Sequence, residues 1–405
     1  NNSITIPSFF SNRYRDENKM LQGIAAIFIV IFFIPYTASG FAACGKLFSS
    51  LFGVNYLTAM IISAIVSFAY TTLGGFLAAS TTDFIQSIIM SVALIVVLIF
   101  GVETAGGIGA VIHNASELPG YLSMTLSYDV NTGKAAPYSA LTIVSTAAWG
   151  LGYFGMPHIL LRFMAIEDEK KLKLSRRVAT IWVVISLFVA VFIGVIGYTM
   201  SKVGALEMLT GSNSETIIVK ISALLSQHGV IFALLAGVIL AGILASTMST
   251  SDSQLLAASS AVSSDILGAF RKDSSNKNGS MAAARITLLV ISVVAAFIAR
   301  NPDSSVFAIV SFAWAGFGAA FGPVVLFSLF WKRTNKWGAL AGMVCGGSMV
   351  FIWKYLIRPL GGIWNIYELL PAFLIACAAI VIVSLLTPKP SKEIEEEFDR
   401  VAQMK

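Results

Sequence analysis

A dense run of hydroxyl side chains is the part of this sequence best suited to chemistry. Residues 246–253 read STMSTSDS and follow the uncharged apolar segment 229–245 without a helix breaker. If the helix continues through the run, four hydroxyls at positions i, i+3, i+4 and i+7 share one face: Ser246, Ser249, Thr250 and Ser253. Oxygen atoms at membrane depth are costly unless something polar lies against them. The run therefore indicates a site for a small hard cation, although such hydroxyls can also bond back to their own helix or hold helices together.

Two carboxylates could share in such a cation site. Asp83 lies in the stretch AASTTDFIQSIIM, at the start of an apolar segment, and Asp252 lies within the hydroxyl run itself. Each carboxylate could help to hold or pass a cation. Asp83 could instead cap the N-terminus of a helix by accepting backbone N–H bonds, and Asp252 could be a solvated charge just beyond the membrane edge. The sequence leaves these alternatives open.

Aromatic side chains in and near a glycine-rich segment form the second candidate site. Three glycines and a proline interrupt the apolar segment 140–165, and interrupted backbone is tolerated at membrane depth only against protein or a wet cavity. Trp149 and Tyr153 are four residues apart, so on an α-helix they share a face and could contact a small apolar ring. An aromatic belt at the membrane interface is the alternative. Tyr36, directly after Pro35, is a further candidate, with core packing as its alternative.

The composition indicates an all-α, polytopic membrane protein as the scaffold. The 405 residues are 57% hydrophobic and 12% charged, against about 25% charged in soluble proteins. Ten apolar segments are long enough to span a bilayer, and they lie near 19–45, 55–79, 83–103, 139–164, 177–201, 229–250, 282–299, 306–330, 336–357 and 366–387. We expect the helix that begins at 229 to extend to about 265, with a short helix near 106–118 and a surface helix over 204–227. The segment 311–327 is rich in small residues and favours either close helix packing or a gating movement.

The distribution of charge sets the expected orientation. The net charge is +6, and most Lys and Arg side chains fall in loops on the side of the N-terminal segment if the ten spans alternate. By the positive-inside rule that side is cytoplasmic, and the charged tail 388–405 lies there as well. Basic residues in short loops between spans do not indicate nucleic-acid binding. The sequence contains no nucleotide-binding loop, zinc spacing or nucleophile elbow, so we do not expect an enzyme.

Five segments carry a resemblance to a known family, namely FFIPYTASG, GGFLAASTTD, LGYFGMPHILLRFMA, GILASTMSTSDSQLL and SFAWAGFGAAFGPVVLFSLFW. Taken in this order they resemble the sodium/solute symporter family, and most closely its sodium/proline branch, over nearly the whole chain. The resemblance implies Na⁺-coupled uptake of L-proline by alternating access in a bacterial plasma membrane, with a cytoplasmic C-terminus. Na⁺ would be the coupling ion, and the small-molecule substrate and the lipid bilayer would be the partners, with no nucleic acid and no obligate protein partner. The alternatives are a symporter for another small carboxylate or compatible solute, such as pantothenate or betaine, and a symporter-like sensor.

The resemblance also implies roles for residues in both candidate sites. Ser249 and Thr250 match paired hydroxyls that ligate Na⁺, and Asp83 matches an acidic residue needed for Na⁺ handling. Ser246 and Asp252 complete the predicted Na⁺ set, although Asp252 stands where some relatives carry Ser. The residues assigned to the substrate site are Trp149, Tyr153, Tyr36 and Ser253.

The fold that the resemblance implies is an inverted-repeat (five-plus-five) transporter core within thirteen spans. About ten of them would be present here, so residues 1–387 would form a membrane transport domain that lacks its first three helices, and residues 388–405 a cytoplasmic tail. A broken helix among the missing three would complete the Na⁺ site with backbone carbonyls. We therefore expect the 405 residues alone to be inactive.

Overall fold

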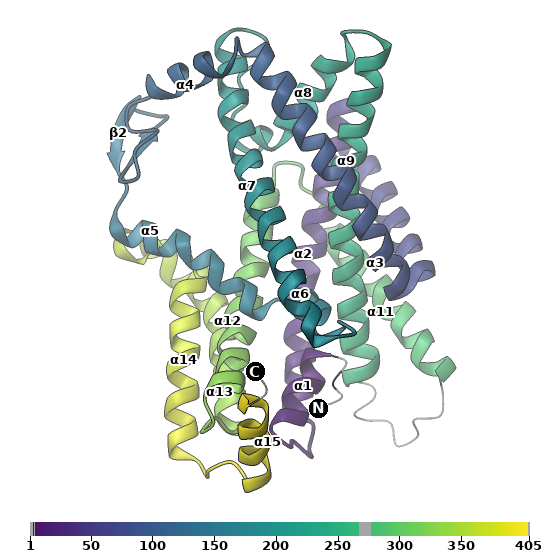
Figure 1. Cartoon of the computed structure of the whole chain (residues 1–405), viewed down its shortest axis with the longest axis vertical. Helices are drawn as coiled ribbons and strands as arrows, with labels where there is room; N and C mark the ends of the chain where they lie inside the picture. The colour runs from purple at the N-terminus through teal and green to yellow at the C-terminus, as the bar shows by residue number, and fades with distance from the viewer. Residues whose placement is uncertain (1–2, 4, 267–276, 404–405) are drawn as a thin grey trace.

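The helices form an elongated bundle whose two chain ends lie at the same end of the molecule (Figure 1). The computed structural model describes residues 3, 5–266 and 277–403. Within this described part, eight helices are long and apolar enough to cross a membrane. The predicted helical, multi-pass architecture is therefore confirmed.

The chain begins with a short capped helix and a long membrane helix. Helix α1 (Ile6–Arg13) starts after Thr5, whose side chain accepts a hydrogen bond from the backbone N–H of Ser8 in a capping box. Helix α2 (Met20–Phe52) contains Pro35 and runs the length of the bundle. It ends at Gly53, which adopts the left-handed conformation that favours glycine.

Two of the predicted spans lie within one helical element, α3 (Tyr56–Thr104). Its two apolar segments are Tyr56–Leu73 and Ser80–Thr104. The Tyr70 hydroxyl donates to the Thr82 hydroxyl over 2.7 Å, whereas twelve residues of straight helix would separate their backbones by about 18 Å. The helix axis must therefore turn sharply between the two segments, as the prediction of two spans requires.

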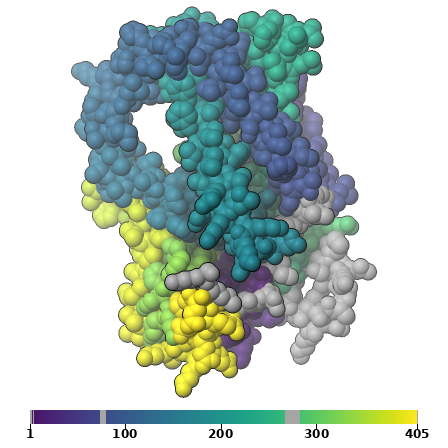
Figure 2. Space-filling model, in the orientation of Figure 1, coloured from purple at the N-terminus to yellow at the C-terminus, as the bar shows by residue number. Residues whose placement is uncertain are grey.

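The loop after α3 carries the predicted short helix and a hairpin that was not predicted. Helix α4 (Ile108–Ser116) is followed by the antiparallel strands β1 (Leu126–Asp129) and β2 (Lys134–Pro137). In Figure 2 this part of the chain arches away from the bundle and leaves an open passage beside the next long helix.

The predicted span at 139–164 is not one helix, which corrects the sequence-based expectation. It consists of α5 (Ala140–Ala147), the 3₁₀ segment η1 (Ala148–Gly155) and α6 (Pro157–Met164). The break falls at Met156, whose backbone is extended with φ −79° and ψ 108°. A residue before proline is disfavoured in the α conformation, and Pro157 is accommodated as the first residue of α6.

The next part of the chain contains two long helices joined by shorter ones: η2 (Glu169–Lys171), α7 (Leu172–Lys202), η3 (Gly211–Thr216), α8 (Ile217–Ser226), α9 (Val230–Ser260) and the π-helical turn η4 (Ala261–Ile266). The predicted helical extension to about 265 is confirmed, because η4 continues α9. The predicted surface helix within 204–227 is shorter than expected and partly buried as α8.

The last part of the chain supplies the remaining membrane helices and the tail: α11 (Lys277–Ile298), α12 (Val306–Phe330), α13 (Lys336–Ile352), η5 (Trp353–Ile357), η6 (Arg358–Leu360), η7 (Gly362–Trp364), α14 (Leu369–Leu386) and α15 (Lys392–Gln403). The apolar part of α11, Ala282–Ile298, is shorter than the eight spanning helices. The predicted ten spans thus comprise eight long helices, this shorter one and the broken segment.

Helix α12 lies at the centre of the packing. Among the described residues, Phe317 and Phe321 are fully buried, and Phe32 of α2 packs edge-on against Phe317. A Cβ added to Gly316 would lie 2.1 Å from the Phe32 ring, and one added to Gly318 would lie 2.8 Å from the backbone of Gly152. The small residues of this segment therefore serve close helix packing, which was one of the two alternatives for 311–327.

Candidate functional site

The hydroxyl stripe lies on α9 as predicted. Ser249 and Thr250 both donate to the backbone carbonyl of Ser246, at 3.1 and 3.0 Å. Both side chains are partly exposed, and Ser246 is exposed. The hydroxyl hydrogens are thus directed back along the helix, which leaves oxygen lone pairs free to accept or to coordinate.

Three helices meet around a single arginine. Arg162 of α6 forms an ion pair with the Oδ2 atom of Asp83 in α3, and the same Nη2 atom donates to the Ser253 hydroxyl of α9 over 2.7 Å. The Asp83 side chain is 11% exposed, and its Oδ1 atom is buried without a hydrogen-bond partner among the described residues. The helix-capping alternative is wrong, because Oδ2 pairs with Arg162 and Oδ1 accepts no backbone N–H bond among the described residues.

Asp252 is fully buried between α9 and α3. The Thr71 hydroxyl donates to its Oδ1 atom over 2.6 Å, and its Oδ2 atom has no hydrogen-bond partner in the described part of the chain. The alternative of a solvated charge beyond the membrane edge is therefore wrong. A carboxylate in this position supplies an oxygen ligand that water does not already satisfy.

The two predicted aromatics do not share a helix face, which corrects the expectation from their spacing. They lie on the 3₁₀ segment η1, where residues four apart are about 120° apart around the axis. Both instead contact Trp314 of α12: Trp149 stacks on it at 5.3 Å, and Tyr153 packs perpendicular to it at 4.8 Å. Trp149 also stacks on Phe307 at 5.5 Å and on Tyr367 at 5.8 Å. Tyr153 is 41% exposed and is the more accessible of the pair.

Tyr36 lies beside the broken segment. Its ring packs edge-on against His158 of α6 with centroids 5.9 Å apart, and it is 8% exposed. The next residue, Thr37, donates to Gln254 of α9 over 3.4 Å. Tyr36 is therefore positioned between the broken segment and α9, and core packing accounts for most of its surface.

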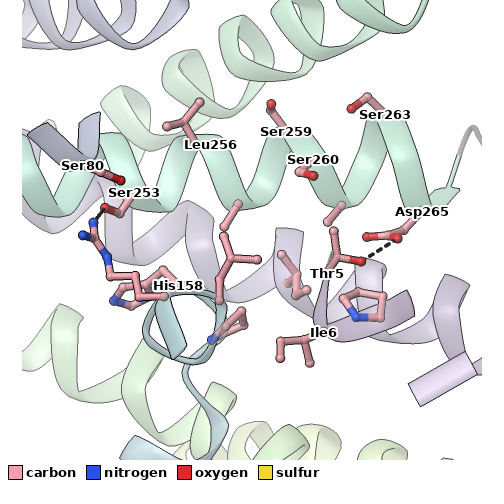
Figure 3. A pocket seen from close by; sticks show the side chains of 17 residues that line it. Thr5, Ile6, Ser80, His158, Ser253, Leu256, Ser259, Ser260, Ser263 and Asp265 are labelled. Atoms are coloured by element: carbon pink, nitrogen blue, oxygen red, sulfur yellow. Dashed lines mark hydrogen bonds between the residues drawn. The ribbon is translucent and has the colours of Figure 1, made fainter. Parts of the chain in front are cut away.

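A cavity of about 340 Å³ runs along α9 and η4 (Figure 3). Ser253, Arg162 and His158 line one part of it, and Thr5 and Asp265 line another. Of the predicted site residues, all of which are described, Ser253 is the one that lines this cavity. The structure thus brings Asp83 and Ser253 together, and it joins Trp149 to Tyr153 through a third ring at a separate place.

Sequence reasoning missed Arg162 and Trp314. Arg162 lies within the predicted span 139–164, and an ionisable residue within a span is itself a sign of function. The helix-breaking residues just before it gave a second sign, because they indicated a segment built for more than spanning. Trp314 had no comparable signal, since its importance comes from which rings it meets in three dimensions.

Long apolar helices, a broken segment packed against α12 and largely buried carboxylates on α3 and α9 define a multi-pass helical membrane protein with polar groups between its helices. The chain belongs to the sodium:solute symporter family, whose model matches residues 1–346. The resemblance seen in the sequence motifs is therefore confirmed.

Several characterised proteins are similar to this chain over most of its length. It is 38% identical to the osmoregulated proline transporter OpuE of Bacillus subtilis, over 96% of this chain and 75% of that protein. It is 38% identical to the sodium/proline symporter of Salmonella typhimurium, over 98% of this chain and 76% of that protein. It is 39% identical to the high-affinity proline transporter PutP of Bacillus subtilis, over 98% of this chain and 80% of that protein.

The fold is similar to that of a solved transporter. A substrate-bound, outward-open Na⁺-coupled sialic acid symporter superimposes with a TM-score of 0.72, covering 96% of this chain and 78% of that one. The two sequences are 16% identical, so this likeness concerns the fold alone.

Proposed function

We propose that this protein takes up L-proline across a bacterial plasma membrane, driven by Na⁺, with its C-terminus in the cytoplasm. The observation that carries the proposal is the identity of 37–39% with sodium/proline symporters and proline transporters over nearly the whole chain. The basic segments around Arg15 and Lys332 both form ion pairs with α15, so they lie together at the end of the bundle that we propose to be cytoplasmic.

The proposed Na⁺ site is built on α9. Ser249 and Thr250 supply the hydroxyl oxygens, Ser246 lies one turn before them on the same face, and Asp252 and Asp83 supply carboxylates nearby. Such oxygens suit a hard monovalent cation. Because Arg162 occupies the Oδ2 atom of Asp83, a cation that reaches this carboxylate must use the free Oδ1 atom or displace the guanidinium.

The proposed substrate site lies on the broken segment. The pyrrolidine ring of proline would contact Tyr153 and Trp149. Tyr36 on α2 and Ser253 on α9 would line the other part of the site. The Trp314 ring supports both η1 aromatics from behind, so these rings offer proline a rigid apolar surface. Rigid aromatic surface favours binding because little side-chain freedom is lost.

The driving force available to such a protein is sufficient for scavenging. Moving one charge through 100 mV provides about 2.3 kcal/mol, and a tenfold Na⁺ gradient adds about 1.4 kcal/mol. Together, one Na⁺ per proline supports an accumulation of roughly 500-fold.

The test is the uptake of labelled proline by the full-length protein in vesicles with an imposed Na⁺ gradient. We expect Ser249→Ala and Thr250→Ala each to raise the Na⁺ concentration for half-maximal uptake about tenfold or more, a loss of about 1.4 kcal/mol. The half-saturating proline concentration should change much less. Thr247→Ala is the matched control, because Thr247 lies on α9 outside the stripe and donates to the Ile243 carbonyl.

Unchanged Na⁺ dependence in both stripe variants would reject this cation site. A panel of unlabelled solutes tests the substrate in the same vesicles. Stronger competition by pantothenate or betaine than by proline would reject proline as the substrate and leave Na⁺ coupling intact.

A further inference from the structure

A buried carboxylate lies in the part of the cavity away from the arginine. Asp265 is on the π-helical turn η4, it is 1% exposed, and it lines the cavity with Thr5 and Ser260. Figure 3 shows the carboxylate directed toward Thr5, with Ser260 on the same side of the helix, further along toward Ser253. π-helical turns within α-helices are frequent at functional sites.

The hydrogen bonds to this carboxylate reach only one of its two oxygens among the described residues. The Thr5 hydroxyl and the Gln22 amide both donate to Oδ1, each over 2.9 Å. The Oδ2 atom is buried and has no hydrogen-bond partner among the described residues. Among the residues that the structure describes, Arg162 is the one Lys or Arg side chain that lines the same cavity, and it is already paired with Asp83.

An ionised carboxylate in this environment is stabilised by a positive partner. Removing a charge from water costs several kcal/mol unless it is paired and fully hydrogen-bonded. Here two neutral groups donate to one oxygen, the other oxygen has no partner among the described residues, and Asp265 lines a cavity wide enough for a small ion. The oxygen atoms available as ligands here belong to carboxylate and hydroxyl groups, which bind hard cations rather than soft metals.

We propose that Asp265, with the hydroxyls of Thr5 and Ser260, forms a second binding site for Na⁺ at the basic end of the bundle. This inference rests on the proposed function. Ser253 and Asp265 line one cavity, and twelve residues of helix place them about 18 Å apart along the axis. Asp265 therefore lies between the stripe at Ser249 and Thr250 and the end of the bundle that we propose to be cytoplasmic.

Such a site affects the response of proline uptake to internal Na⁺ and not its response to external Na⁺. It binds Na⁺ that arrives from inside, so it sets the internal Na⁺ concentration at which proline uptake is inhibited. It does not contribute to the capture of Na⁺ from outside. The alternative is purely structural, namely that Asp265 only ties α1 and α2 to the end of α9 through Thr5 and Gln22.

The experiment uses the full-length protein in vesicles, with Na⁺ set separately on the two sides. Asp265→Asn retains an oxygen that accepts from Thr5 and Gln22, but it removes the charge. We expect the internal Na⁺ concentration for half-inhibition of proline uptake to rise at least tenfold. The external Na⁺ concentration for half-maximal uptake should change less than twofold.

Two further variants separate binding from structure. Gln22→Met removes one hydrogen bond to Oδ1 and leaves both the charge and the hydroxyls. The internal Na⁺ concentration for half-inhibition of uptake should therefore stay within twofold of the value for the unchanged protein. Ser260→Ala removes one proposed ligand and should raise the inhibitory concentration about threefold, which keeps the test available if D265N does not fold.

The outcomes are distinct. Internal Na⁺ inhibition that is unaltered in D265N, or unaltered in S260A where D265N does not fold, overturns the second site. Equal shifts of the inhibitory internal Na⁺ concentration in D265N and Q22M overturn the second site as well. They would mean that Asp265 only connects α1 and α2 to the end of α9. Proline uptake that is independent of Na⁺ in the unchanged protein would instead overturn the proposed function.

Discussion

Arg162 shows how much can depend on one side chain in this protein. Its guanidinium holds a carboxylate of α3 and a hydroxyl of α9 at once, so it joins two membrane helices through a third, broken one. Removing it would leave the Asp83 carboxylate, which is 11% exposed, without its counter-ion. Any cation that binds at Asp83 therefore competes with an internal cation of the protein.

Trp149→Ala should weaken proline binding before it affects Na⁺. Trp149 stacks on Trp314, and its ring is part of the apolar surface proposed for the substrate. We expect the proline Kd, measured with labelled proline at saturating Na⁺, to rise about tenfold, which corresponds to about 1.4 kcal/mol. The half-saturating Na⁺ concentration should change less.

Phe307→Leu is the control for this prediction. Phe307 stacks on Trp149, so its replacement disturbs the packing of the Trp149 ring but leaves the ring itself in place. It should leave the proline Kd within about threefold. A proline Kd that Trp149→Ala does not alter would exclude this ring from the substrate site.

The sequence identified the chemistry of single residues better than their surroundings. The oxygens at 246–253 and Asp83 stand out because polar groups are rare in apolar segments. Their partners could not be predicted in the same way: Asp252 is buried because Thr71 of α3 packs against it, and α3 is about 180 residues distant in sequence. Asp265 was not singled out either, because its burial depends on α1 and α2.

At the scale of elements, the contact between η1 and α12 decides where the aromatics lie. A Cβ on Gly155 would come within 2.2 Å of the Phe317 carbonyl oxygen and 2.8 Å of the Gly322 amide nitrogen, both of which are backbone atoms. Glycine is therefore required for η1 to approach α12 so closely. The Gly and Pro residues of 139–164 indicated a weak helix, but the 3₁₀ conformation depends on this contact and could not be read from them.

Gly155→Ala should consequently disturb both stability and substrate binding. Overpacking against backbone costs about 1–3 kcal/mol, so we expect a lower midpoint of thermal unfolding in detergent and a raised proline Kd. Gly150→Ala is the matched control on the same segment, since a Cβ at Gly150 would meet nothing within 4 Å. Equal behaviour of the two variants would contradict the requirement for close contact.

At the scale of the whole molecule, a loop glutamate joins helices away from the end that carries both termini. Glu215, in η3, accepts hydrogen bonds from Lys46 of α2 at 2.8 Å, from the Ser305 hydroxyl at 2.8 Å, and from the backbone N–H groups of Val306 and Phe307 at 3.1 Å. A carboxylate at the start of α12 also interacts favourably with the helix dipole. One side chain thus connects η3, α2 and α12, the element that supports the aromatics.

This connection should make stability depend on pH in a defined direction. Partial burial raises the pKa of Glu215, but the hydrogen bonds from Lys46, Phe307, Val306 and Ser305 outweigh it and hold the pKa below its ordinary value, which is about 4.3. A carboxyl group whose pKa is lowered on folding stabilises the protein fully above its ordinary pKa. That contribution is lost as the pH falls through the lowered value.

Glu215→Gln should therefore lower the free energy of unfolding by about 1–2 kcal/mol at pH 7, and the difference from the unchanged protein should shrink below about pH 4.3, where the native carboxyl also becomes neutral. Thermal unfolding in detergent at pH 7 and at pH 3.5 measures both values. Glu207→Gln is the control, because Glu207 is 66% exposed in its pair with Lys220 and such a surface pair contributes roughly 0–1 kcal/mol. A deficit of E215Q that persists undiminished at pH 3.5 would mean that the charge of Glu215 does not hold α12 in place, because the Gln variant would then be losing packing rather than the interactions of a carboxylate.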